Sequence, residues 1–174
     1  DLIEQELFII KREDKKKLLS KLLDQYRGSV LLFSRTKRGA GNIRRAIKGM
    51  GHNAAEIHSD RTLKQRREAL EGFKTGKYRI LVATDIAARG IDVVGIETVI
   101  NYDLPDDAEN YVHRIGRTGR AGHEGRAISF ATPEQRGEIR SIETLIKTAL
   151  PVSEHPDLPS QEFQTKSLFK SKGW

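Results

Sequence analysis

Short apolar runs alternate along this chain with longer segments in which apolar residues recur every three or four positions. The short runs predict buried strands, because polar residues or glycine bound each of them. We place these strands at residues 29–34, 53–57, 79–83, 96–101 and 125–131, with a further extended segment within residues 1–10. The amphipathic segments predict helices over residues 13–26, 36–49, 62–74, 108–115 and 134–149. This alternation indicates an α/β fold with a central, mostly parallel β-sheet flanked by helices on both faces.

The pattern of strands and helices ends near residue 150. Three prolines follow within residues 151–159, among scattered polar residues that offer no obvious core face. We therefore expect residues 1–150 to form a single domain and residues 151–174 to form a flexible or surface-draped extension. Because the chain begins at Asp1 without a methionine, we expect it to be part of a longer protein.

The chain carries a net charge of +7, because 31 lysines and arginines outnumber 24 aspartates and glutamates. This excess favours polyanionic partners such as nucleic acid or nucleotides, although a solvated basic surface explains it equally well. Lys15, Lys16 and Lys17, for example, are expected on the outer face of the first helix. The absence of cysteine excludes disulfides, thiol catalysis and cysteine-bound zinc. With no long apolar run or secretory leader, we expect a soluble, cytoplasmic protein without a membrane partner.

Polar residues follow several of the predicted strands at their carboxyl ends, where open α/β sheets bind ligands. They include arginines, hydroxyl groups and an aspartate, namely Arg35, Thr36, Asp60, Arg61 and Thr84. A row of such groups suits a sequence-independent grip on a nucleic-acid backbone. Ordinary loop polarity explains any one of these loops, so the prediction depends on the set.

Residues 113–120 contain three arginines, one histidine and two glycines. Unpaired guanidinium groups are costly to bury, which argues against a core element. On a segment interrupted by glycine, they suit bidentate contacts to phosphate oxygens. We expect this segment and residues 83–92 to lie at one edge of the sheet.

These segments carry a family resemblance. Residues 83–92 (ATDIAARGID) and 111–120 (YVHRIGRTGR) resemble motifs V and VI of the DEAD-box RNA helicases. Residues 32–37 (LFSRTK) resemble motif IV, and residues 57–66 resemble the HGD and QxxR region. The resemblance covers residues 4–150 and implies a single RecA-like domain. This domain would be the C-terminal half of a core that couples ATP hydrolysis to RNA unwinding or remodelling of RNA–protein complexes.

The resemblance also implies a role for individual residues. Arg117 and Arg120 would act as arginine fingers on the γ-phosphate of ATP, where negative charge spreads during phosphoryl transfer. Asp92 would accept a hydrogen bond from the ribose of ATP, and Gly90 would lie near both ATP and RNA. The residues implied in interdomain contact or motif packing are His113 and Arg114. Those implied in RNA binding are Arg35, Thr36, Asp60, Arg61, Arg66, Thr84 and Gly90.

The sequence departs from the family pattern by substitutions within motifs and by the absence of other motifs. Leu63 replaces the QxxR glutamine, and the HGD segment reads His58-Ser59-Asp60. In addition, the chain contains neither a GxxxxGK[ST] phosphate-binding loop nor a DEAD tetrad. The resemblance places these, with the ligands of Mg²⁺, on an N-terminal RecA-like domain of the same protein. We therefore expect this chain alone not to hydrolyse ATP.

Three other interpretations remain open. Gly39 and Gly41 open a helix, and Glu56 lies on the next strand, which imitates a dinucleotide-binding fingerprint. Arg44 occupies the third glycine position, so a glycine-containing first helical turn is favoured. The chain is also compatible with a stand-alone RNA-binding module without catalysis, or with half of a superfamily 2 DNA helicase.

Overall fold

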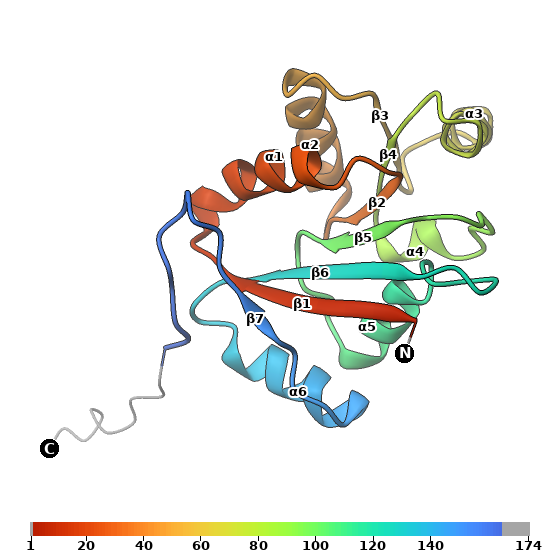
Figure 1. Ribbon diagram of the computed structural model, residues 1–174. Coiled ribbons are helices and arrows are strands. Elements are labelled where there is room, and N and C mark those ends of the chain that lie inside the picture. Colours follow the sequence, from red (N-terminus) through yellow and green to blue (C-terminus); the bar gives the residue numbers. More distant parts are fainter. Residues whose placement is uncertain (1, 165–174) are drawn as a thin grey trace, which may run out of the picture.

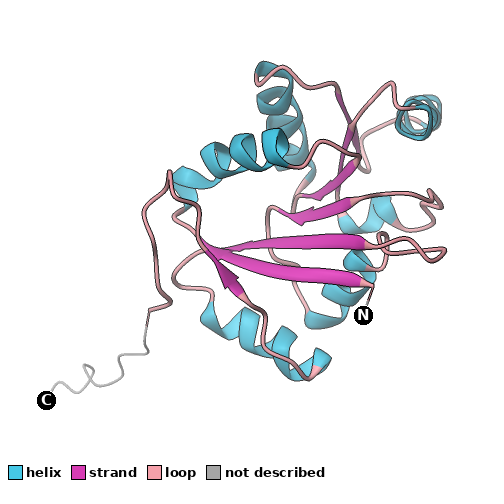
Figure 2. Cartoon of the chain, in the orientation of Figure 1, coloured by secondary structure: helices cyan, strands magenta, loops and turns pink. Residues whose placement is uncertain are grey.

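The computed structural model describes residues 2–164, which form a seven-stranded sheet (Figure 1). The strands lie in the order β3-β4-β2-β5-β6-β1-β7, and each neighbouring pair is parallel. Their bounds are β1 Ile3–Ile9, β2 Val30–Phe33, β3 Ala54–Ile57, β4 Ile80–Ala83, β5 Thr98–Asn101, β6 Gly125–Ala131 and β7 Val152–Ser153. Figure 2 shows the strands as a twisted layer with helices on either side. The predicted fold class is confirmed.

The helices divide between the two faces of the sheet. Right-handed connections between parallel strands place helices on opposite faces according to the direction in which each connection crosses the sheet. One face carries α1 (Lys15–Gln25), preceded by the short turn η1 (Arg12–Asp14), and α2 (Lys37–Gly49). The other carries α3 (Leu63–Thr75), α4 (Asp85–Ala88), α5 (Ala108–Ile115) and α6 (Arg136–Ile146).

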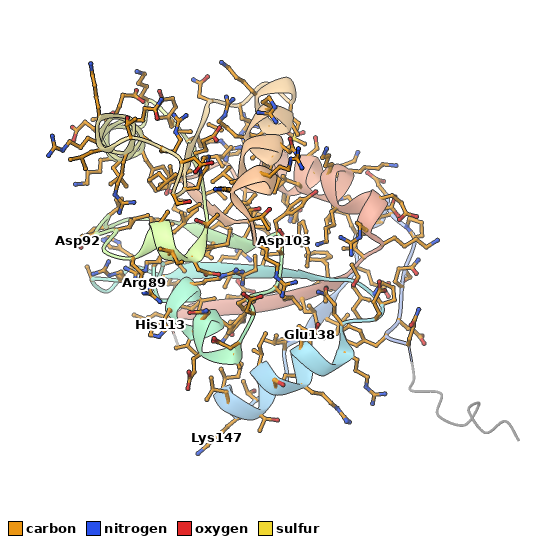
Figure 3. All side chains as sticks on the ribbon, turned by 180° about the vertical axis from the view of Figure 1, so that it is seen from behind. Arg89, Asp92, Asp103, His113, Glu138 and Lys147 are labelled. Carbon is orange, nitrogen blue, oxygen red and sulfur yellow. The ribbon has the colours of Figure 1, made fainter. Side chains whose placement is uncertain are left out.

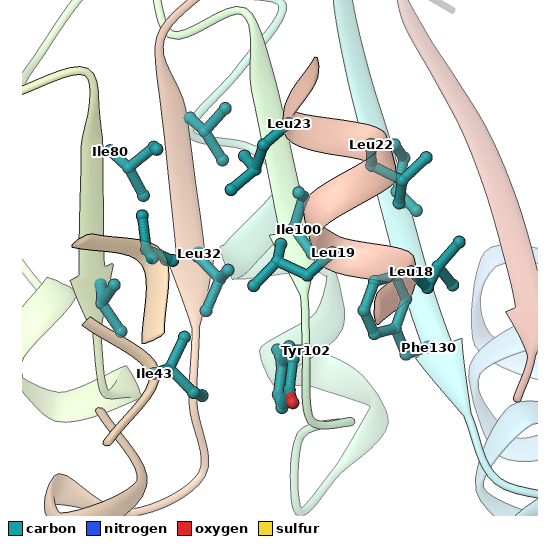
Figure 4. Close-up of a cluster of buried hydrophobic side chains, with 14 of the residues drawn as sticks. Leu18, Leu19, Leu22, Leu23, Leu32, Ile43, Ile80, Ile100, Tyr102 and Phe130 are labelled. Atoms are coloured by element: carbon teal, nitrogen blue, oxygen red, sulfur yellow. The ribbon is translucent and has the colours of Figure 1, made fainter. Parts of the chain in front are cut away.

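The largest hydrophobic cluster lies between the sheet and the two helices α1 and α2 (Figure 4). The leucines of α1 recur with helical spacing, so one stripe of the helix faces the sheet. These are Leu18, Leu19, Leu22 and Leu23, each at most 2% exposed. Figure 4 shows them close to Ile100 and Phe130 on the strands. Burial of this stripe fixes α1 on the sheet, because each fully buried leucine contributes about 1.5–3 kcal/mol.

Side-chain caps determine where three helices begin. Thr36 caps α2, Asp107 caps α5, and Thr62 forms a reciprocal capping box with Gln65 at the start of α3. Each cap satisfies a backbone N–H that would otherwise lack a helical partner. The loops that end at these caps are therefore held at the carboxyl ends of β2, β3 and β5.

The predicted strands and helices are present, with ends shifted by a few residues. Two short elements, α4 and β7, were not predicted. Four residues in α4 and two in β7 are too few to display a hydrophobic period. The extended segment expected near the start of the chain is β1, which lies between β6 and β7.

Residues 151–164 pack against the domain. The carbonyl oxygen of Pro151 accepts a hydrogen bond from the Leu7 N–H at 2.9 Å, and β7 then pairs with β1. Leu158 and Phe163 pack against two of the hydrophobic clusters. The expected boundary at residue 150 therefore does not mark the end of the packed structure. The rest of the expected extension lies outside the described residues.

Candidate functional site

A cavity of about 460 Å³ lies between α4 and α5. Both helices contribute charged and polar side chains to it, and Figure 3 labels two of the lining residues, Arg89 just after α4 and His113 on α5. The lining residues are Phe33, Asp85, Ala88, Arg89, Asp107, Glu109, Asn110, His113, Arg114 and Arg117. The His113 side chain is exposed, so this wall of the domain is open to a partner.

Arg114 forms the floor of this cavity and is only 1% exposed. Its guanidinium donates two hydrogen bonds to the Asp85 carboxylate, at 2.6 and 2.8 Å. It also donates to the Asn101 side chain and to the Asp103 carbonyl, and it lies 4.9 Å from the Phe33 ring centre. These contacts are all within the domain. Arg114 therefore ties α5 to α4 and β5.

Arg117 and Arg120 meet the segment that ends at Asp92. The Arg117 Nη1 donates to the carbonyl oxygen of Ile91 at 2.9 Å. The Arg120 Nη2 lies 3.5 Å from an Asp92 carboxylate oxygen, and the Asp92 side chain is 82% exposed. An exposed ion pair of this kind contributes little to stability, so a phosphate can displace the carboxylate from Arg120. The Asp92 carboxylate and the Arg120 guanidinium are therefore accessible beside Arg117.

Residues 83–92 and 113–120 lie side by side, as expected, but they do not both stay at the carboxyl edge of the sheet. Helix α5 starts at the carboxyl ends of the strands and runs back along them for about 12 Å, given its eight residues. Arg117 and Arg120 follow this helix and therefore lie toward the amino ends of β5 and β6. Figure 3 shows Arg89, Asp92 and His113 at one side of the molecule, apart from Asp103.

The loop after α5 is held tightly against the amino ends of the strands. Thr118 Oγ1 donates to the carbonyl oxygen of Ile96, just before β5. Gly119 has a φ of +66°, and an added Cβ there would lie 2.6 Å from a carbon of the Ile3 side chain. Only glycine combines this φ with so close an approach. The loop thus fixes where the chain delivers Arg120.

The residues predicted at the carboxyl edge lie on neighbouring loops. Thr36 caps α2, and Arg35 pairs with Asp106 at 2.7 Å. Asp60 pairs with Lys37 at 3.0 Å, which joins the loops after β2 and β3. Because these pairs are exposed, they leave the side chains free to exchange partners.

Two further members of this edge are partly buried. The Thr84 N–H donates to the carbonyl oxygen of Ile57 at 3.3 Å, which connects the loops after β3 and β4. The Arg61 Nε is buried and has no hydrogen-bond partner within residues 2–164.

Arg66 braces the segment after β4 from below. Its guanidinium donates to the carbonyl oxygens of Ala87 and Arg89, at 2.6 and 3.3 Å. Gly90 follows with a φ of +81° and nothing within 4 Å of an added Cβ. Arg66 therefore supports a left-handed turn whose backbone is open to close approach.

Comparison with known proteins identifies the family of this domain. The family model described as the helicase conserved C-terminal domain matches residues 14–122. The C-terminal domain of the DEAD-box protein Dbp5 superposes with a TM-score of 0.79 at 33% identity, covering 87% of this chain and 90% of that one. The chain belongs to the family of DEAD-box helicase C-terminal domains.

Two other relatives extend the comparison. The Escherichia coli DEAD-box protein SrmB, solved bound to RraA, gives a TM-score of 0.88 at 29% identity, covering 94% of this chain and 98% of that chain. The ATP-dependent RNA helicase CshA of Listeria monocytogenes is 49% identical over 149 residues, or 84% of this chain. This chain spans only 28% of the length of that helicase.

Within this DEAD-box domain, sequence reasoning missed a cluster beside the HGD-like segment. The Glu56 carboxylate accepts from Arg44 Nε at 2.6 Å and lies 2.6 Å from His58 Nε2. Burial alone would raise the pKa of Glu56, but hydrogen bonds from His58 and Arg44 hold it below its ordinary value. Because Glu56 is engaged in this way, it does not serve as the ribose partner of a dinucleotide site. Residues 56 and 58 are two positions apart, so an extended chain places their side chains on the same face. This spacing could have revealed the pair.

Lys15 was expected to face solvent, and this expectation is wrong. It is 5% exposed, and its Nζ donates to the Tyr102 carbonyl at 2.8 Å and to an Asp103 carboxylate oxygen at 3.3 Å. Burial lowers its pKa, whereas Asp103 opposes that shift. The other Asp103 oxygen accepts from the Arg35 N–H at 2.9 Å. Lys15 thus helps to fix the motif IV loop of the DEAD-box domain.

Two negative findings concern residues 2–164. None of the helices there is long and apolar enough to cross a membrane. In the same residues, no group of three or more histidines, aspartates and glutamates is arranged to hold a metal ion.

Proposed function

We propose that this domain is the C-terminal half of the core of an ATP-dependent RNA helicase. In this role it couples ATP hydrolysis to local strand separation or to remodelling of RNA–protein complexes. The observation that carries the proposal is the placement of Arg117, Arg120 and Asp92 together on the open wall beside α5. A separate set of phosphate donors at the carboxyl edge of the sheet supports it.

The ATP-binding part of the proposal rests on complementary charge. Arg117 and Arg120 would donate N–H groups to the γ-phosphate oxygens, where negative charge spreads during phosphoryl transfer. A positioned arginine of this kind raises turnover by a factor on the order of 10³ to 10⁵. Asp92, released from Arg120, would accept from a ribose hydroxyl, and the open turn at Gly90 would allow the backbone to approach. These residues fit a nucleotide triphosphate but lack a cradle for its β-phosphate.

We propose that a second domain supplies the cradle for the β-phosphate. Asp85 is already engaged by Arg114, and Asp92 is needed for the ribose, so these carboxylates do not fit a magnesium site. The Mg²⁺ ligands and the phosphate-binding loop would lie on an N-terminal RecA-like domain. Bound there, Mg²⁺ would neutralise charge on the β- and γ-phosphates. His113, exposed on the wall of the cavity, would meet that domain when it closes over the nucleotide.

The RNA would lie along the carboxyl edge of the sheet. Arg35, Thr36, Arg61 and Thr84 offer donors to phosphate oxygens without reading base edges. Asp60 is an acceptor, and it would therefore meet a ribose hydroxyl, a group that distinguishes RNA from DNA. Arg66 and Gly90 would support this edge by shaping the turn after β4. The yeast protein Dbp5, with 32% identity to this chain, has been solved bound to RNA and ADP BeF3.

The half-enzyme interpretation is tested by ATP hydrolysis, measured with and without single-stranded RNA. Two proteins are compared: this chain alone, and this chain rejoined to its N-terminal domain. We expect no turnover by the chain alone and RNA-stimulated turnover by the rejoined protein. Turnover by the chain alone would overturn the interpretation, because it would require a complete phosphate site within these residues. Stimulation by DNA as strong as by RNA would favour a DNA helicase instead.

Arg120→Ala in the rejoined protein tests the arginine finger itself. We expect ATP turnover to fall by roughly 10³-fold or more, with RNA affinity largely retained. Arg140→Ala, an exposed arginine on α6, is the matched control and should leave turnover unchanged. Equal turnover by the two variants would show that Arg120 takes no part in ATP hydrolysis.

A further inference from the structure

Helix α2 differs from the other helices in the sign of its charges. It carries five basic residues and no acidic residue between Lys37 and Gly49. The other described helices of eight residues or more each contain at least one aspartate or glutamate. Solvated helix faces usually mix both signs, since like charges on neighbouring turns repel one another. An anionic partner therefore explains the composition of α2 better than solvation alone does.

Two of the five basic residues are neutralised within the domain. Lys37 pairs with Asp60, and Arg44 pairs with Glu56. The other three, Arg38, Arg45 and Lys48, are exposed, and none has a carboxylate within 4.0 Å among residues 2–164. On a helical projection these three lie within about 80° of one another, given about 100° per residue. They therefore form one outward face, which Asn42 extends.

The charge of this face is directed toward the carboxyl edge of the sheet. Arg45 donates to Asn42 Oδ1, and its Nη1 lies 3.5 Å from the position that a Cβ on Gly41 would occupy. The guanidinium therefore leans back over the preceding turn, toward the start of the helix. Arg38 is the second residue of α2 and follows the motif IV loop directly. Figure 3 shows nitrogen-tipped side chains projecting from this helix.

We propose that the outer face of α2, formed by Arg38, Asn42, Arg45 and Lys48, binds the phosphate backbone of RNA that continues beyond the sheet edge. The proposal rests on the proposed function, because it places a single strand along Arg35, Thr36 and Arg61. RNA that continues from this strand, as a flanking duplex, passes the start of α2. Cations spaced along a helix suit a phosphate backbone and require no base contact.

The test compares two double variants of this chain, R38Q/R45Q on α2 and R136Q/R140Q on α6. Both remove two exposed arginines from a helix, and they change the net charge equally. Affinity is measured by fluorescence anisotropy across a salt series. One probe is a short single strand of about six nucleotides, and the other is the same strand joined to a hairpin stem. Thermal unfolding confirms that both variants fold.

With the hairpin probe, we expect R38Q/R45Q to weaken binding about tenfold and to lower the salt slope by about 1–2. R136Q/R140Q should change affinity by less than about twofold. With the short strand, neither variant should differ from the parent chain. Equal losses in both variants would overturn the proposal, because they would report net charge alone. No loss in R38Q/R45Q would also overturn it, and an acidic protein would then be the partner to test on this face.

Failure of the proposed function gives a different result. Arg61→Gln removes a proposed phosphate donor at the sheet edge, so it should weaken binding of the short strand. If the parent chain and its Arg61→Gln variant bind both probes equally well, the sheet-edge site is wrong. A loss confined to R38Q/R45Q would then still identify α2 as an RNA-binding surface.

Discussion

The buried guanidinium of Arg114 joins two helices that carry the candidate nucleotide site. Arg114→Ala would leave the Asp85 carboxylate and the Asn101 side-chain oxygen without the Arg114 donor in a largely buried position. Breaking a buried ion pair in this way costs about 3–5 kcal/mol, so we expect the free energy of unfolding to fall by that amount. Urea unfolding of this chain, monitored by circular dichroism, measures the change.

The control for this prediction is Arg140→Ala on the exposed face of α6, which should change stability by less than about 0.5 kcal/mol. Arg114→Lys keeps the charge but loses the bidentate geometry, so it should give an intermediate loss. Equal unfolding midpoints for Arg114→Ala and Arg140→Ala would show that the buried network contributes nothing.

Tyr111 links stability to alkaline pH. It is fully buried, its hydroxyl donates to Gln5 Oε1 at 2.6 Å, and burial raises its pKa well above 10.0. Above pH 10.0 the unfolded chain loses this proton while the folded chain keeps it. The contribution of Tyr111 is therefore complete below that pH and is lost as the pH rises. Tyr111→Phe should cost about 1 kcal/mol at neutral pH, from the lost hydrogen bond, and less at alkaline pH.

Urea unfolding of both proteins from neutral to alkaline pH tests this dependence on Tyr111. The two stability curves should converge or cross as the pH rises. Curves that stay parallel would mean that Tyr111 titrates normally in the folded chain. An absorbance titration provides a second readout, in which the variant lacks one late-ionising tyrosine.

Single residues show where sequence reasoning succeeded and where it could not. Arg117, Arg120 and Asp92 were named from the family resemblance of their motifs, and the structure brings them together. Lys15 was misplaced because its partners, Tyr102 and Asp103, lie almost ninety positions away along the chain. Helical periodicity records which side chains are apolar, but it carries no information on a distant carboxylate that draws a lysine inward.

The position of Arg120 depends on Gly119, in the loop after α5. Gly119→Ala must adopt a φ near +66° and must also displace Ile3, whose side chain lies 2.6 Å from the new methyl group. Gly122 is the matched control, because its φ is +80° and nothing lies within 4 Å of an added methyl group. We expect Gly122→Ala to cost about 1–2 kcal/mol from the backbone alone, and Gly119→Ala to cost more. Urea unfolding compares the two, and equal losses would mean that the Ile3 contact is relieved without cost.

The strands and longer helices followed from hydrophobic periodicity because each presents at least one regular apolar face. Residues 83–92 and 113–120 meet as expected, but their contact extends away from the carboxyl edge for a geometric reason. The prediction assigned residues to strand ends, but eight residues of α5 intervene and carry the chain back along the sheet. The family resemblance named the residues of the site, whereas the direction of α5 determines its location.

The molecule as a whole includes a segment that the sequence pattern set apart. Residues 151–164 cover β1 on one side through β7, and Ser153 Oγ donates to Glu6 at 2.6 Å. Leu158 and Phe163 add apolar contacts on opposite faces of the sheet. Neither the two-residue strand nor these isolated apolar side chains shows a period. Their placement depends on the finished sheet, which a local pattern cannot reveal.

Ending the chain after residue 150 should therefore destabilise the domain. Loss of two partly buried side chains, at about 1–2 kcal/mol each, and of the β7 hydrogen bonds predicts a fall of about 3–4 kcal/mol in the free energy of unfolding. The double variant Leu158→Ala/Phe163→Ala should give roughly two thirds of this loss, measured by urea unfolding. An unchanged midpoint for the shortened chain would show that the segment does not stabilise the sheet.

The shortened chain also leaves the backbone of β1 unpaired along one side, and such edges recruit other strands. Light scattering should therefore detect self-association of the shortened chain at concentrations where the full chain remains monodisperse.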